Sequence, residues 1–90
     1  MPQAIIDPAE LRRFAHNLKT FNTELQNQMA VLQGQLHHLG STWRDQEHQK
    51  FSEEFEQTMQ VIRRFVEAAD QHIPFLLRKA DRAEDYLRQR

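Results

Sequence analysis

The histidines are the only side chains in this sequence whose type hints at chemistry. There are five: His16, His37, His38, His48 and His72. No two stand four apart with a carboxylate between them, which is the spacing that a metalloprotease helix needs. His38 and His48 flank a glycine-marked turn, and with Asp45 or Glu47 they could approach as zinc ligands. Surface histidines near a turn are far commoner, so we predict no metal site. A pH-sensitive association is the alternative, because histidine titrates near neutrality.

Catalysis finds little support elsewhere in the chain. The sequence has no cysteine, no glycine-rich phosphate loop and no Gly-X-Ser-X-Gly elbow. Glu53, Glu54 and Glu56 follow one another too closely to converge on one face of a helix. They are typical of a solvated acidic helix side. We therefore predict that the protein is not an enzyme and binds no cofactor.

Composition narrows the class of protein further. Ninety residues with a net charge of −1 make at most one domain, and a mixed surface of this kind does not favour nucleic acid. The C-terminal bases alternate with acids such as Asp81 and Glu84, so we predict no nucleic-acid partner there. The N-terminus has no basic region followed by an apolar core, and no apolar run reaches the roughly 20 residues of a membrane span.

The elements that would position these side chains begin with one long helix over residues 8–39. Asp7 is a good N-cap, Pro8 suits the first helical position, and Glu10 completes a capping box. The apolar residues then recur in steps of three and four, which is helical spacing. Gly40 follows the last of these, where a left-handed C-cap residue is expected.

A second helix over 43–88 follows a short turn at 40–42. Thr42 and Asp45 predict a capping box at its start, which places Trp43 in the first helical turn. Pro74 predicts a kink or short break, because proline leaves the carbonyl four residues back without its donor.

Together the two helices form an all-α antiparallel hairpin with one apolar stripe along each. The predicted core and dimer stripe consists of Leu11, Phe14, Leu18, Phe21, Leu25, Met29, Leu32, Leu36, Phe51, Phe55, Met59, Ile62 and Phe65. With the turn centred near residue 41, the numbers of antiparallel partners add to about 82. Pro8 would then lie opposite Pro74, and residues 75–90 would protrude as a tail with no neighbour in the chain.

Two helices cannot cover both sides of these stripes, so the hairpin needs a partner. A contiguous exposed apolar patch is rare on soluble monomers unless something binds there. We expect two hairpins to complete a four-helix bundle, as a homodimer or as a heterodimer with a related chain. The alternative is a monomer whose tail folds back as a third helix.

Length, helical pattern and a tryptophan at the turn resemble the WXG family, small helical hairpins exported by type VII secretion systems. The early secreted antigenic target proteins of mycobacteria are its best known members. The family's Trp-X-Gly motif falls at Trp43-Arg44-Asp45, with Asp45 in place of glycine. Leucines just before the turn (Leu36 and Leu39) and a phenylalanine eight residues after the tryptophan (Phe51) also match the family's pattern.

The resemblance implies a non-enzymatic export substrate or adaptor that acts through dimerisation. It also implies a tail signal, in which a tyrosine is followed four residues later by an acid, and a contact of that tail with a secretion ATPase. Tyr86 matches, whereas Arg90 stands at the acidic position. The implied location is the cytoplasm before export, then secretion without a cleaved signal peptide. The alternative function is an intracellular adaptor or chaperone-like module that binds an amphipathic helix of a partner protein.

Overall fold

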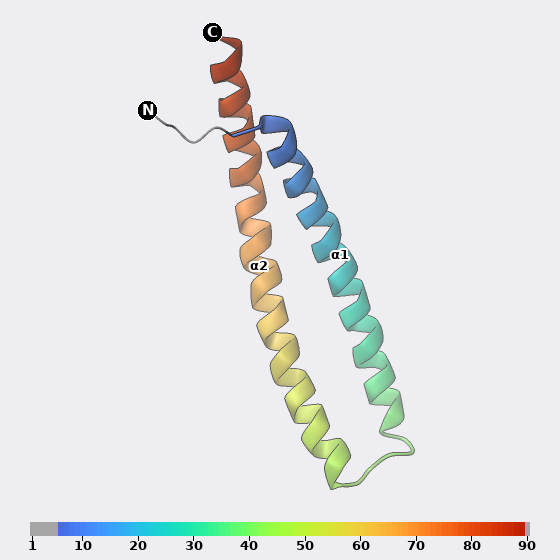
Figure 1. The fold of residues 1–90 in the computed structure, drawn as a ribbon. Coiled ribbons are helices and arrows are strands. Elements are labelled where there is room, and N and C mark those ends of the chain that lie inside the picture. Colours follow the sequence, from blue (N-terminus) through green and yellow to red (C-terminus); the bar gives the residue numbers. More distant parts are fainter. Residues whose placement is uncertain (1–5, 90) are drawn as a thin grey trace.

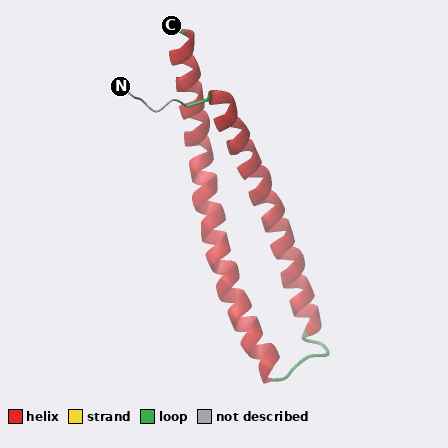
Figure 2. Ribbon diagram, in the orientation of Figure 1, coloured by secondary structure: helices red, strands yellow, loops and turns green. Residues whose placement is uncertain are grey.

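The protein is a two-helix hairpin (Figure 1; Figure 2). The computed structural model describes residues 6–89, in which α1 spans Pro8–Leu39 and α2 spans Gln46–Arg88. Both helices lie side by side along a rod of 67 × 22 × 15 Å, and no strand occurs among these residues. The first helix has the predicted range, whereas the second begins three residues later than predicted.

The start of α1 follows from its capping residues. The Asp7 carboxylate accepts hydrogen bonds from the backbone N–H groups of Ala9 (2.9 Å) and Glu10 (3.3 Å), and Pro8 occupies the first turn. Two of the free donors at the helix N-terminus are thereby satisfied.

The end of α1 differs from the prediction. Gly40 has φ −61° and ψ −14°, so the expected left-handed cap is wrong. Its N–H donates to the His37 carbonyl at 3.1 Å, and Ser41 and Thr42 donate to the next carbonyls in the same manner. The last carbonyls are therefore satisfied by tight turns of right-handed backbone, which need no positive φ.

The loop is longer than predicted, covering residues 40–45. Asp45 has extended backbone and is the N-cap of α2, because its carboxylate accepts from the His48 N–H at 3.0 Å. The Thr42 hydroxyl donates back to the Leu39 carbonyl instead, so the predicted capping box does not form. Trp43 consequently lies in the loop and not in the first turn of the helix.

The second helix runs through Pro74 without a break. Pro74 is exposed, so its ring lies on the solvent side of α2. Its missing N–H leaves the Asp70 carbonyl without the usual helical donor.

A seam of residues seven apart joins the helices. Its buried members are Ala15, Asn22 and Met29 on α1, and Met59, Val66, Ile73 and Ala80 on α2. A strict spacing of seven on both helices is the pattern of an antiparallel coiled coil. The intrachain core is therefore one narrow line of side chains.

The register differs by about ten residues from the predicted pairing. Asn22, expected near residue 60, donates from Nδ2 to the Asp70 carboxylate at 3.0 Å. Arg12 contacts Asp81 and Glu84, each at 2.7 Å. The later start of α2 accounts for only about three of these residues, because ends at Leu39 and Gln46 alone would give pairs that add to about 85. The rest is a displacement of the two helices along each other.

This register corrects the predicted tail. Residues 75–90 were expected to lack any neighbour in the chain, but Ala80 is buried and Arg12 binds Asp81 and Glu84. Pro74 accordingly lies within the paired part of the hairpin and not opposite Pro8. Only the last turns of α2 extend beyond the start of α1 (Figure 1).

Candidate functional site: an uncovered apolar face and the turn

Two flanks of the seam differ in chemistry. One flank is polar, and its residues stand three positions before or four positions after a seam residue. We call it the polar edge: Arg12, Gln33, Glu56, Asp70 and Glu84. Its members meet across the helices, since Arg12 contacts Glu84 at 2.7 Å and the Gln33 amide donates to Glu56 at 3.3 Å. Because these residues pair, the same flank of both helices lies on one side of the hairpin.

The opposite flank is apolar and uncovered. We call it the apolar face: Phe14, Phe21, Leu32, Leu39, Phe51 and Phe65. These side chains are 46–57% exposed. Phe14, Phe21 and Phe65 each directly precede a buried seam residue, which turns them about 100° away from the seam. Together they present roughly 500 Å² of apolar surface, at the upper end of what a soluble monomer carries.

The predicted stripe therefore divides between two environments. Met29 and Met59 are buried in the seam. Five of its members lie on the apolar face. The others are half-buried. Leu36 continues the seam, seven residues after Met29, and the rest lie between the seam and the apolar face: Leu11, Leu18, Leu25, Phe55 and Ile62.

The turn motif packs onto the start of α2. The half-buried Trp43 ring meets the His48 imidazole edge-on, with ring centroids 4.8 Å apart, and its backbone N–H donates to the Leu39 carbonyl at 2.8 Å. The Arg44 Nε donates to the Gly40 carbonyl at 2.9 Å. Asp45 has φ −90° and caps α2, so a left-handed conformation is not needed where the family motif has glycine.

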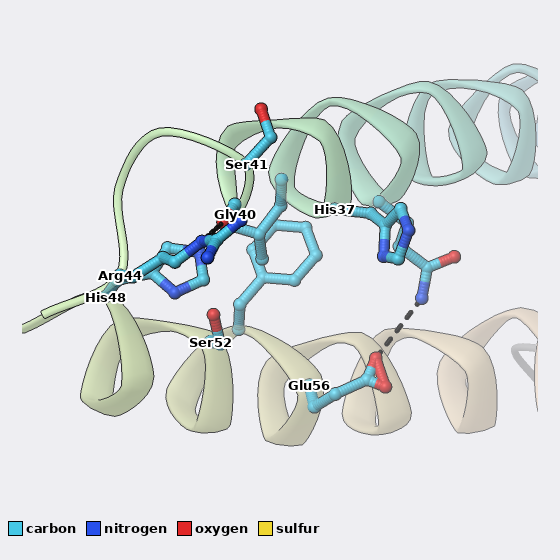
Figure 3. A pocket seen from close by; sticks show the side chains of 10 residues that line it. His37, Gly40, Ser41, Arg44, His48, Ser52 and Glu56 are labelled. Atoms are coloured by element: carbon cyan, nitrogen blue, oxygen red, sulfur yellow. Dashed lines mark hydrogen bonds between the residues drawn. The ribbon is translucent and has the colours of Figure 1, made fainter. Parts of the chain in front are cut away.

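A hollow of about 580 Å³ lies beside the turn, between the two helices (Figure 3). Leu36 and Phe55 supply its apolar surface. Figure 3 shows Arg44 and His48 at one end and His37 and Glu56 at the other. The His48 ring packs against Gly40, where an added Cβ would stand 3.7 Å from the imidazole Cε1.

The C-terminal part of α2 is held by charge. Two hydrogen-bonded carboxylates, Asp81 first and Glu84 second, raise the pKa of Arg12 above its ordinary value. Arg88 lies 3.5 Å from Glu84 and 3.8 Å from Asp85. Tyr86 is 69% exposed, and Arg90, the other tail residue singled out from the sequence, lies outside the described residues.

Sequence reasoning missed Asn22, Arg12 and the hollow. Asn22 stands seven residues from both Ala15 and Met29, so the seven-residue spacing of its neighbours was the available signal. A stripe of large apolar side chains does not include Asn22, because its side chain is polar. Nothing in the sequence marked the partners of Arg12, which are 69 and 72 residues away.

Two kinds of feature do not occur in the described part of the chain. Within residues 6–89, no three histidine or acidic side chains group closely enough to hold a metal ion. In the same range, neither helix has a stretch long and apolar enough to cross a membrane.

Comparison with known proteins identifies relatives of this fold. The family model WXG100, proteins of 100 residues with WXG, matches residues 3–86. The wild-type secreted protein EsxB of Bacillus anthracis str. Sterne is similar, with 31% identity, a TM-score of 0.75, and coverage of 93% of this chain and 97% of that one. A point mutant of EsxB gives 31% identity, a TM-score of 0.78, and coverage of 90% of this chain and 94% of that one.

The selenomethionine-labelled EsxB structure gives the same picture, with 30% identity, a TM-score of 0.75, and coverage of 96% of this chain and 98% of that one. No curated protein sequence matches the chain closely enough to count as a relative. Dimerisation into a four-helix bundle is consistent with the family. The match over residues 3–86, with the hairpin shared by EsxB, shows that this chain belongs to the WXG100 family.

Proposed function

We propose that the chain is a non-enzymatic, secreted helical hairpin of a type VII-like system, acting as exported substrate or adaptor through dimerisation. The observation that carries the proposal is the apolar face. Two such faces would bury on the order of 1000 Å² together, which is about the lower limit for a specific protein–protein interface. The secreted EsxB proteins, similar over almost the whole chain, support the export part of the proposal.

The partner that we favour is a second copy of the chain, with a related hairpin as the alternative. Residues 43–62 carry a net charge of −3 and residues 63–90 a net charge of +2. Opposed copies would bring acidic and basic segments together, so the charge pattern favours self-pairing with a defined orientation.

Light scattering on a sizing column tests the dimer. We expect a mass of twice 10.8 kDa. Phe21→Glu, on the apolar face, should give the single-chain mass. Gln26→Glu is the matched control, since it adds the same charge at a position seven residues before Gln33 of the polar edge. A single-chain mass for the wild type would contradict self-pairing and favour a partner helix from another protein.

Export is tested at the last turns of α2. The corrected register makes removal of residues 75–90 unsuitable, because it would also remove buried Ala80 and both partners of Arg12. Tyr86→Ala is sharper, since this side chain is exposed. If the tail contacts a secretion ATPase, Tyr86→Ala should lose export and keep the dimeric mass. Export at the wild-type level would count against Tyr86 as part of the signal.

A further inference from the structure

The hollow beside the turn exists because α2 has only a small side chain at its seam position there. Ser52 stands seven residues before Met59, at a position filled further along α2 by Val66 and Ile73. Gly40, on the other side of the hollow, has no side chain. Two small residues at one level of a coiled coil leave space that the helices cannot close.

The hollow opens on the polar edge. Gln33 and Glu56, which are members of that edge, line it, and no residue of the apolar face does. A second hairpin on the apolar face would therefore leave the hollow accessible. Binding of a ligand in the hollow and dimerisation through the apolar face would therefore use different surfaces.

The two ends of the hollow differ in charge. At the turn end, Arg44 uses only Nε, for the Gly40 carbonyl, and no described residue accepts from its two terminal amino groups. His48 Nε2 is buried there and has no partner within the described chain. At the other end, Glu56 already accepts from Gln33 at 3.3 Å. An anionic group is therefore favoured only at the turn end.

We propose that this hollow binds a carboxylate carried on a short apolar body. Leu36 and Phe55 would contact the apolar body, and the terminal amino groups of Arg44 would donate to the carboxylate. A small rotation of the imidazole would let His48 Nε2 donate as well, which satisfies a buried polar atom. Such a carboxylate has two sources: a free aryl or alkyl acid, or the C-terminus of a peptide that ends in an aromatic residue.

Trp43 provides the readout, because it is the only tryptophan and its ring touches His48. The wild-type protein is titrated with 3-phenylpropionate and with acetyl-Gly-Ser-Phe, while tryptophan fluorescence is recorded. The neutral amides of both compounds are the ligand controls. We expect saturable binding of an acid with a dissociation constant on the order of 1 mM, and about tenfold weaker binding of its amide. Preference for one of the two acids identifies the source.

Two substitutions at one position test the place of binding. Ser52→Leu should fill the hollow and abolish binding, whereas Ser52→Ala leaves the space open and should bind as the wild type does. Arg44→Gln should weaken binding of the acid about tenfold and leave binding of the amide unchanged. Neither Ser52 variant should change the mass in solution, which separates this proposal from the dimer. The proposal would be overturned if neither acid bound at a ligand concentration about 20 times the expected dissociation constant. It would also be overturned if the amides bound as tightly as the acids, or if Ser52→Leu bound the acids as tightly as the wild type.

Discussion

Asn22 is the most unusual residue of the seam, and replacing it with leucine should stabilise the protein. It is 1% exposed, its Nδ2 donates to Asp70, and its Oδ1 is buried without a partner in the described chain. Leucine would add about 1.5–3 kcal/mol of apolar burial and remove about 1–3 kcal/mol of unsatisfied polar burial. The lost bond to the Asp70 carboxylate costs about 1.5–3 kcal/mol, and half-buried Asp70 can turn to water. The net expectation is a gain of about 1–2 kcal/mol in the free energy of unfolding.

Thermal unfolding followed by circular dichroism at 222 nm measures this change. The expected rise in Tm is roughly 5–10 °C for a chain of this size. Protein concentration is held fixed, because the stability of a dimer depends on it. Asn27→Leu is the matched control, since Asn27 is exposed on the outside of α1 and should change Tm by little. A fall in Tm for Asn22→Leu, with Asn27→Leu unchanged, would show that the bond to Asp70 outweighs apolar burial and would refute the reasoning.

Three further substitutions test packing and capping by the same thermal method. Gly34→Ala should stabilise by about 1 kcal/mol, because nothing within the described chain lies within 4 Å of the added Cβ; a loss of stability would indicate that a partner helix approaches there. Val66→Ala removes a fully buried side chain and should cost about 2 kcal/mol; a change below about 0.5 kcal/mol would contradict a packed seam at this level. Asp45→Ala removes the cap that accepts from His48 and should cost about 1 kcal/mol, while Asp45→Asn should retain most of it; equal losses would exclude capping as the cause.

How far the sequence predicts this fold depends on whether a signal is local. The bounds of α1 follow from Asp7, Pro8 and the end of the apolar spacing at Leu39, all of which act within a few residues. The start of α2 offered two acceptors close together, Thr42 and Asp45, and the choice between them depends on how the loop packs. That choice explains about three residues of the shift in register. The rest depends on how the two helices pack along each other, which no local signal in the sequence reports.

The candidate site shows the same limit. Spacing in steps of three and four identifies an apolar stripe, but it does not separate the seam residue Met29 from the uncovered Phe21. That division depends on which side of each helix faces the other. The hollow depends on Gly40 and Ser52 meeting at one level, which no pattern within a single helix reveals.

The bonds of Arg12 to Asp81 and Glu84 have a mechanical consequence. The start of α1 and the last turns of α2 lie together at the open end of the hairpin (Figure 1). A force that separates the two ends of the chain would therefore load these ion pairs first. The contacts behind them, Asn22 with Asp70 and then Gln33 with Glu56, would be loaded one after another. A hairpin pulled in this geometry unzips step by step and does not shear along its whole length. Its resistance to pulling is therefore set by one contact at a time, beginning with a single arginine, and the loop with Trp43 is the last part to be reached.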